Sequence, residues 1–257
     1  MARYTFGTDD PGARRLETIA RFFNPLAARV IQQHLDDQPR QSAVDLGCGP
    51  GFSTDMLAKA SGCSKTYGLD SAIHFIKLAE ARFPNYTFIL HDLTQIPFPV
   101  QADVMYVRFV LSHLQHVVQT VNRWLTALKP GGMLFIDETE TVESEVEVFQ
   151  HYLAMNAGMI ASQGACLWIG KTLAEGEYEA EVVSSTCEPI PVANFQAATW
   201  FLPNVETVWR TDPYVQARLS PQDRQYISAE ITRIMESGDS REQSVWNMRR
   251  LVLRSKA

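Results

Sequence analysis

The stretch "AVDLGCGPGFST" at residues 43–54 constrains the fold of this chain more than any other segment. Its apolar start predicts a short buried strand, and "STDMLAKA" (residues 53–60) has the apolar spacing of a helix. Between them, three glycines and a proline within residues 47–51 allow a sharp turn and close approach of a ligand to the main chain. Because a helix start offers free N–H groups and a positive dipole end, the motif indicates a site for a nucleotide-like ligand.

The alternation of strand and helix continues along the chain. Further strands are predicted at residues 65–70, at 86–93, within 102–114 and at 131–138. Residues 11–35 are expected to form one or two helices broken near Asn24-Pro25, and helices are also expected at 71–83 and 117–130. This rhythm predicts a parallel sheet wrapped by helices.

The pattern changes after Glu138. Residues 141–175 are expected to be mostly helical, 180–192 to form a sixth strand, and 244–256 the last strand. Residues 193–238 are expected to be helical with breaks at Pro203, Pro213 and Pro221. Without a long linker or a repeat, residues 1–257 are expected to form one domain with its core at 40–138.

Composition and charge exclude several classes of protein. A net charge of −6 with scattered basic residues argues against a nucleic-acid partner. No segment has the length and apolarity of a signal peptide or a membrane span, so we expect a soluble, cytoplasmic protein without a membrane partner. The cysteines show no metal-binding spacing, which predicts reduced thiols and no metal site: Cys48, Cys63, Cys166 and Cys187.

The glycine spacing distinguishes between two ligands. A dinucleotide site uses G-x-G-x-x-G, but here Phe52 stands where the last glycine should be, after Gly47, Gly49 and Gly51. Asp45, just before the turn, suits a ligand with a cationic end better than a pyrophosphate. The turn therefore favours a ligand other than a dinucleotide.

Four ordered motifs carry a family resemblance: "VDLGCGPG" (44–51), "YGLD" (67–70), "HDL" (91–93) and "LKPGG" (128–132). With them the chain resembles the class I S-adenosylmethionine-dependent methyltransferases of the small-molecule type, over about residues 40–138 and elsewhere in general layout. The resemblance implies an α/β fold: a Rossmann-like, seven-stranded, mostly parallel sheet with helices on both faces and N-terminal helices. It also implies a helical lid between strands five and six, at about 141–175, and S-adenosyl-L-methionine as cofactor.

The resemblance assigns cofactor contacts to matched positions. Asp70, followed by Ser71, would accept hydrogen bonds from the ribose hydroxyls, as an acidic residue does in the analogous dinucleotide site. Asp92 and the N–H of Leu93 would meet the adenine. The main chain would approach the rest of the cofactor at Gly47 and Gly49.

Three further residues have open roles at this site. Asp45 would either hold the turn or reach the methionine amino group. Arg108, after the fourth strand, would lie near the methionine part or be exposed or ion-paired. Arg15, beside Arg14 on the N-terminal helix, would bind the methionine carboxylate or belong to a solvated helix face.

Catalysis and acceptor binding would involve other residues. His113 and His116 follow the fourth strand and are candidates for a general base, or else structural histidines of that loop. Within the lid, Met155, Met159, Trp168 and Tyr152 would form an apolar wall for the acceptor, or merely cover the sheet.

The function that we expect is methyl transfer from S-adenosylmethionine to a small organic molecule, by a monomer or homodimer. One alternative is a relative that binds the same cofactor and catalyses another step, such as a cyclisation. A second is a non-catalytic cofactor-binding module. A nucleotide-dependent oxidoreductase is disfavoured by Phe52 and by "LKPGG". The acceptor atom, oxygen, nitrogen or carbon, stays open.

Overall fold

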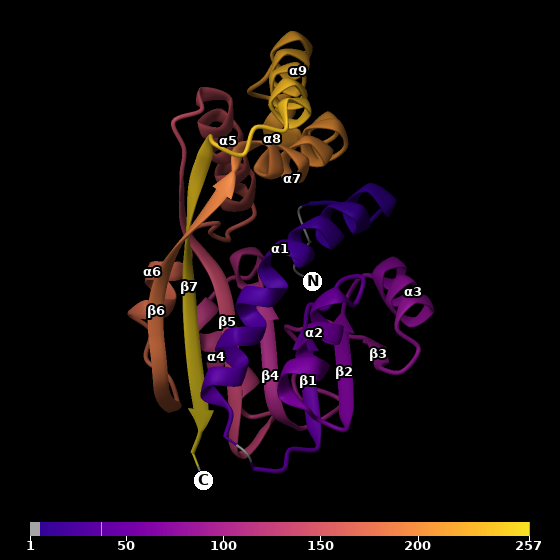
Figure 1. Ribbon diagram of the computed structural model, residues 1–257, viewed down its shortest axis with the longest axis vertical. Helices are drawn as coiled ribbons and strands as arrows, with labels where there is room; N and C mark the ends of the chain where they lie inside the picture. The colour runs from indigo at the N-terminus through magenta and orange to yellow at the C-terminus, as the bar shows by residue number, and fades with distance from the viewer. Residues whose placement is uncertain (1–5, 37, 257) are drawn as a thin grey trace.

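The computed structural model describes residues 6–36 and 38–256, in which seven strands form one sheet in the order β3-β2-β1-β4-β5-β7-β6 (Figure 1). Neighbouring strands from β3 to β5 are parallel, and β7 is antiparallel to both β5 and β6. The predicted α/β, mostly parallel sheet is therefore confirmed. The strands are β1 Ser42–Leu46, β2 Lys65–Asp70, β3 Thr87–Leu90, β4 Ala102–Arg108, β5 Leu128–Glu143, β6 Ala180–Ala193 and β7 Gln243–Ser255.

Helices cover both faces of this sheet because successive side chains of a strand point to opposite faces. Ala43 and Val104 pack with α1 (Asp10–His34) and α2 (Phe52–Ser61). Their neighbours Val44 and Met105 belong to the core on the other face, together with α4 (Val117–Leu125) and α6 (Gly170–Ala174). Helix α3 (Ile73–Arg82) packs against Phe88 of β3. The central strands are thus buried on both faces, as their apolar sequences indicate.

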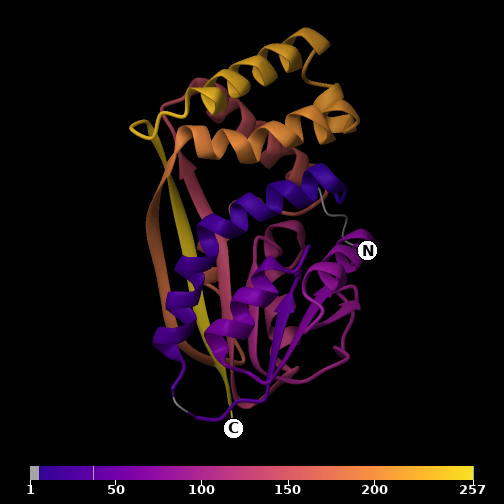
Figure 2. The same cartoon turned by 45° about the vertical axis from the view of Figure 1, so that its right-hand side comes forward.

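Helix α1 is continuous, so the predicted break near Asn24-Pro25 is wrong. Pro25 lies inside the helix, which bends along its length in Figure 2. Packing keeps the helix intact, because Ile19, Phe23, Ala27 and Ile31 recur every four residues and are all buried.

A helical cap lies over one end of the sheet, formed by α5, α7, α8 and α9 (Figure 1). These helices share an apolar core with the first half of α1. Of residues 141–175, expected as the lid, α5 belongs to the cap, whereas the first three residues end β5 and α6 packs with α4. The cap helices are α5 Glu147–Ser162, α7 Asn194–Glu206, α8 Pro213–Gln216 and α9 Pro221–Ser237.

Two of the three expected proline breaks are observed. Pro213 and Pro221 are the first residues of α8 and α9, where the missing proline N–H costs no helical hydrogen bond. Pro203 lies inside α7, so no break occurs there. None of the helices in the described ranges is both long and apolar enough to cross a membrane.

Candidate functional site

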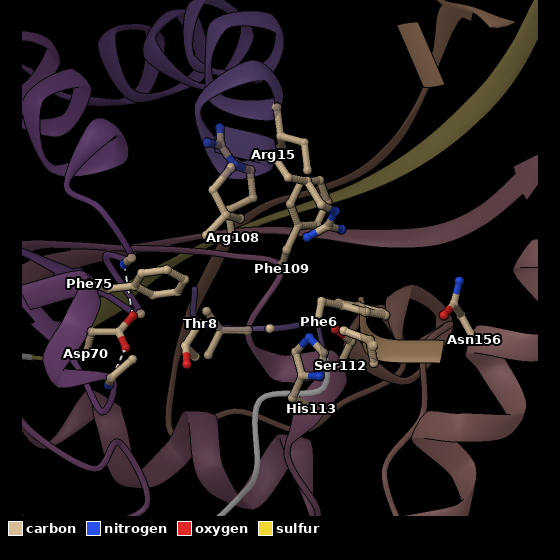
Figure 3. Close-up of a pocket in the computed structure, with 18 of the residues that line it drawn as sticks. Phe6, Thr8, Arg15, Asp70, Phe75, Arg108, Phe109, Ser112, His113 and Asn156 are labelled. Carbon is tan, nitrogen blue, oxygen red and sulfur yellow. Dashed lines mark hydrogen bonds between the residues drawn. The ribbon is translucent and has the colours of Figure 1, made fainter. Parts of the chain in front are cut away.

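A cavity of about 770 Å³ lies between the carboxyl ends of the central strands and the cap (Figure 3). We call its two ends the floor end, at the glycine turn, and the cap end, at α5 and α7. In Figure 3, Asp70 marks the floor end and Asn156 the cap end, with Arg108, Phe109 and His113 between them. The predicted site residues that line the cavity are Arg15, Gly47, Gly49, Asp70, Ser71, Asp92, Leu93, Arg108, His113 and Trp168.

The glycine turn after β1 forms part of the floor end. Gly47 has φ 75°, and a Cβ atom built on it would lie 2.4 Å from Cγ2 of Val110. A side chain at this position would therefore both strain the backbone and clash with the loop after β4. The turn also begins α2 at Gly51, so backbone N–H groups at this helix start lie beside the cavity.

Asp70 ends β2 beside this turn. Its Oδ2 accepts a hydrogen bond from the N–H of Gly49 at 2.9 Å, and its Oδ1 accepts one from the N–H of Ala72 at 2.8 Å. Burial raises the pKa of Asp70, while these backbone donors oppose the shift. The carboxyl is thus held in one orientation at the cavity wall, and each oxygen retains capacity to accept another hydrogen bond.

Asp92 and Leu93 follow β3 at the same end. The Oδ1 of Asp92 accepts hydrogen bonds from the N–H and hydroxyl of Thr94 at 3.0 and 2.8 Å, and Oδ2 is not used in them. Although partial burial favours the neutral form, the hydrogen bonds from Thr94 lower the pKa of Asp92. An ionised carboxylate therefore remains at the cavity.

Asp45 is fully buried and does not line the cavity. Its Oδ2 accepts hydrogen bonds from the hydroxyls of Ser53 and Thr54, both at 2.7 Å. Burial raises its pKa to about 6. Of the two roles left open, the observed hydrogen bonds match the one in which Asp45 holds the turn to the start of α2.

Arg108 ends β4 and lines the cavity, and in Figure 3 its guanidinium lies beside α1. Its Nη2 donates to Oδ1 of Asn24 at 2.7 Å, and Asn24 Nδ2 donates to the carbonyl of Phe52, the first residue of α2. Its Nη1 is buried without a hydrogen-bond partner, and no Asp or Glu of residues 6–36 or 38–256 forms an ion pair with it. Its charge also acts on the nearby buried carboxyls of Asp45 and Asp137, and without a direct ion pair it can still attract an anionic ligand.

Glu138 shapes the loop after β4 and was not predicted from the sequence. This fully buried residue of β5 accepts hydrogen bonds at Oε1 from the N–H groups of Val110 and Leu111, at 2.7 and 2.8 Å. The adjacent Phe109 has φ 56°, unusual for an aromatic residue, and lines the cavity. Burial raises the pKa of Glu138 to about 8.

The two candidate histidines have different surroundings. His113 lines the cavity, and burial, assisted by the positive charge of Arg15, lowers its pKa to about 3. So weakly basic an imidazole is poorly matched to proton abstraction near neutral pH. His116, whose backbone has φ 51°, is exposed at the start of α4 and is not among the residues that line the cavity.

Arg15 reaches the cavity from α1. Its Nε donates to the carbonyl of Trp200 in α7 at 2.9 Å, and its guanidinium carbon lies 5.0 Å from the centroid of the Phe6 ring. No ion pair with a carboxylate holds it within the described part of the chain. Arg15 therefore joins α1 to the cap, and its Nη atoms donate to none of the described residues.

The cap end is largely aromatic. Trp168 is half-buried and lines the cavity, as does Tyr152. Met159 is instead fully buried in the apolar core of the cap, and Met155 packs against that core. Neither methionine lines the cavity, because α5 directs this part of its surface toward its neighbours in the cap.

Asn156 of α5 lines the cap end and has no signal in the sequence. It is 2% exposed, and its Oδ1 accepts a hydrogen bond from Trp209 Nε1 at 3.2 Å. Its Nδ2 has no hydrogen-bond partner. Because Trp209 can only donate, the amide orientation is fixed and the unpaired donor belongs to Asn156.

Comparison with known proteins places the floor end in a recognised domain. Residues 44–136 match the family described as "Methyltransferase domain". A trans-aconitate 2-methyltransferase of Rhodopseudomonas palustris (strain BisA53) is 30% identical over 130 residues, 51% of this chain and 50% of that protein. The chain thus spans about half the length of the curated relatives that it matches.

Solved structures share the fold. A structure described as a putative methyltransferase, from Bacillus halodurans, has a TM-score of 0.58 at 16% identity, covering 90% of this chain and 99% of its own. Phosphoethanolamine N-methyltransferase 2 of Haemonchus contortus, solved with S-adenosylmethionine, has a TM-score of 0.55 at 14% identity. That match covers 95% of this chain and 57% of the other. At such identities the likeness concerns the fold alone.

Proposed function

We propose that this chain, which carries a class I methyltransferase domain at residues 44–136, transfers a methyl group from S-adenosylmethionine to a small organic acceptor. The observation that carries the proposal is the floor end. Gly47, Gly49, Asp70, Asp92 and Leu93 come from three separate segments of that domain, and all of them line one cavity.

The residues present fit this cofactor. The anchored carboxyl of Asp70 can accept hydrogen bonds from ribose hydroxyls, and Asp92 with Leu93 lies where the resemblance puts the adenine. The guanidinium of Arg108, a residue that lines the cavity, suits the methionine carboxylate. When bound, the cofactor supplies a methyl group that is already activated by a positively charged sulfur.

The chain's own contribution is then mainly positional. The cap borders the cavity opposite the floor end, where its side chains would limit water and hold the acceptor in line with the methyl group. His113 has too low a pKa to remove a proton efficiently, so we do not give it the role of general base. An acceptor atom that needs no deprotonation fits such a site best.

Binding measurements test the cofactor, and product analysis tests the reaction. In calorimetry we expect S-adenosylmethionine and S-adenosylhomocysteine to bind with similar dissociation constants, on the order of micromolar. Tight NADH binding without a response to either compound would contradict the proposal. Incubation with methyl-labelled cofactor and metabolite extracts then separates methyl transfer from cyclisation and from a non-catalytic role, since only the first labels a product.

Two expectations from the sequence stay predictions beside this proposal. One is a cytoplasmic location, and the other is a monomer or homodimer. Light scattering on the purified chain measures the second directly.

A further inference from the structure

Two arginines, Arg15 and Arg108, line the cavity, whereas the cofactor has one carboxylate. We infer that the methyl acceptor is a small monocarboxylic acid with an apolar, ring-sized body, and that its carboxylate pairs with Arg15 and takes the methyl group. This inference rests on the proposed function and names the acceptor class of the same site.

Among the described residues that line the cavity, Arg15 and Arg108 are the only lysines or arginines. Neither is ion-paired with a described carboxylate. The cap end also carries Asp9 and Asp212, but each accepts hydrogen bonds from backbone N–H groups at the start of a helix, α1 or α8. Two guanidinium groups are therefore available for anionic ligands.

The two arginines are anchored to different parts of the molecule. Arg108 is connected through Asn24 to the carbonyl of Phe52, where α2 leaves the glycine turn. Arg108 lines the cavity at the end of β4, next to the glycine turn that follows the neighbouring strand β1, and we assign to it the single carboxylate of the cofactor. Arg108 thus accounts for the cofactor carboxylate.

Arg15 is anchored at the cap instead. Its Nε is held by the carbonyl of Trp200 in α7, and its guanidinium lies over Phe6. Figure 3 shows Arg15 pointing toward Phe6, Ser112 and His113 rather than toward Asp70. A fixed Nε leaves the terminal Nη atoms to bind a carboxylate, and a guanidinium can bind both oxygens at once.

The other residues at the cap end indicate the polarity of the acceptor's body and how many charges it can carry. It has the concave, mostly apolar character of a small-molecule site, and among the described residues Arg15 is its one cation without an ion pair. A compact acid with three carboxylates would bury two of them among rings without a cationic partner, at a large desolvation cost. The aromatic side chains from the middle of the cavity to the cap end are Phe6, Phe109, Tyr152, Trp168, Phe201 and Trp246.

This acceptor differs from the one in the names of the curated relatives. Trans-aconitate has three carboxylates, whereas Arg15 can neutralise one. Five of the six rings, those other than Phe109, lie outside residues 44–136, so the family match does not cover the wall that selects the acceptor.

Methyl transfer to a carboxylate needs no base. One carboxylate oxygen uses a lone pair to form the O–CH₃ bond, while the S–CH₃ bond breaks and its electron pair stays on sulfur. The products are a methyl ester and an uncharged thioether, and no proton moves. His113, neutral and weakly basic, therefore need not take part.

The acid class is tested on the unaltered chain with methyl-labelled S-adenosylmethionine. The panel holds benzoate, cinnamate and phenylacetate, their primary amides, and the tricarboxylates trans-aconitate and citrate. We expect label in the aromatic acids alone, released as volatile methanol by mild alkali because it is an ester. Label that resists alkali, or preferential labelling of tricarboxylates or amides, would overturn the inference.

Arg15 is tested with Arg15→Gln and a matched control, Arg14→Gln. Arg14 is the exposed neighbour on the same helix and does not line the cavity, so both variants lose the same charge. Arg15→Gln should raise the KM for the acid about ten- to hundredfold, the range expected on losing a charged hydrogen bond, and leave S-adenosylhomocysteine affinity unchanged. Arg14→Gln should change neither.

The outcomes separate this inference from the proposed function. An equal loss of S-adenosylhomocysteine affinity in Arg15→Gln would assign Arg15 to the cofactor and refute its role here. A chain that binds the cofactor but esterifies no monocarboxylic acid would refute the acid class and leave cofactor binding intact. A chain that binds no cofactor would refute both the proposed function and this inference. The acid panel is measured on the unaltered chain, so its result does not depend on whether Arg15→Gln folds.

Discussion

The N–H of Gly49 donates a 2.9 Å hydrogen bond to the carboxyl of Asp70, joining the loop after β1 to the last residue of the neighbouring parallel strand β2. The bond links the turn that lets a ligand approach the main chain to the acidic side chain proposed to bind the ribose. Sequence places these residues 21 positions apart, and the sheet brings them together at one edge of the cavity. Cofactor affinity should therefore depend on both.

Removal of the Asp70 carboxylate should weaken cofactor binding. In Asp70→Ala the ribose hydroxyls lose a charged acceptor worth about 1.5–3 kcal/mol, so the dissociation constant should rise on the order of ten- to hundredfold. Calorimetry with S-adenosylhomocysteine measures this. Glu80→Ala, an exposed carboxylate on α3, is the matched control and should bind like the original chain. An unchanged constant in Asp70→Ala would mean that the ribose is held elsewhere.

Trp168 should act on the acceptor and hardly on the cofactor. It is half-buried at the cavity and belongs to none of the apolar cores. Trp168→Ala should raise the acceptor KM or lower kcat, with cofactor affinity within about a factor of three, or ~0.7 kcal/mol. A core tryptophan would instead cost roughly 3–5 kcal/mol of stability. A melting temperature far below that of the original chain would rule out the acceptor role.

Met159 should behave in the opposite way. Because it is fully buried in the cap, Met159→Ala should lower the free energy of unfolding by about 2–5 kcal/mol. Denaturant unfolding checks this. A stable variant with a raised acceptor KM would restore the wall role expected from the sequence.

Glu138 should matter for the loop after β4. Glu138→Ala leaves the N–H groups of Val110 and Leu111 without their acceptor, at about 1–3 kcal/mol for each group left buried and unpaired. Glu138→Gln keeps an acceptor oxygen and should lose much less. If both variants are equally stable and equally active, Glu138 does not position Phe109.

The pH dependence of stability should carry the signature of Glu138. Its pKa is raised from 4.5 to about 8, so the folded chain keeps a proton that the unfolded chain has already released. Its stabilising contribution is therefore complete below about pH 4.5 and is lost as pH rises through about 8. From about pH 5 to about pH 9, the original chain should lose stability relative to Glu138→Gln, whose amide does not titrate. If the melting temperatures of the two chains change with pH in the same way, the raised pKa of Glu138 is refuted.

The sequence predicted the alternation of strands and helices, and it predicted the glycine turn with the residues around it. The order of strands followed from alternating apolar runs, and the floor end followed from glycine spacing and from aspartates at strand ends, Asp70 and Asp92. These signals are local, since each residue lies next to the strand that positions it. The contacts proposed for the cofactor remain predictions, but the places of these residues around one cavity were foreseeable.

The cap end was not foreseeable in the same way. Helix α5 carries both Asn156, which lines the cavity, and Met159, which is buried in the cap, and only tertiary packing distinguishes their surroundings. Glu138 looked like any acidic residue near a strand end, yet it is fully buried by contacts that the sequence does not specify. The position of the Arg15 side chain depends on its hydrogen bond to the carbonyl of Trp200, 185 residues further along the chain.

Strands β5, β6 and β7 lead from the sheet to the cap and stay paired with one another in hydrogen-bonded ladders over that length. Pairing of β5 with β7 reaches Glu143 and Val245, and pairing of β6 with β7 reaches Ala193 and Gln243. Swinging the cap aside would break those ladders, whereas α1 meets the cap through side chains and the Arg15 hydrogen bond to Trp200. We therefore expect ligands to enter and leave the cavity beside α1, when the first turns of this helix move briefly away from the cap. Amide hydrogens in the ladders should exchange slowly with solvent, and those at the start of α1 much faster.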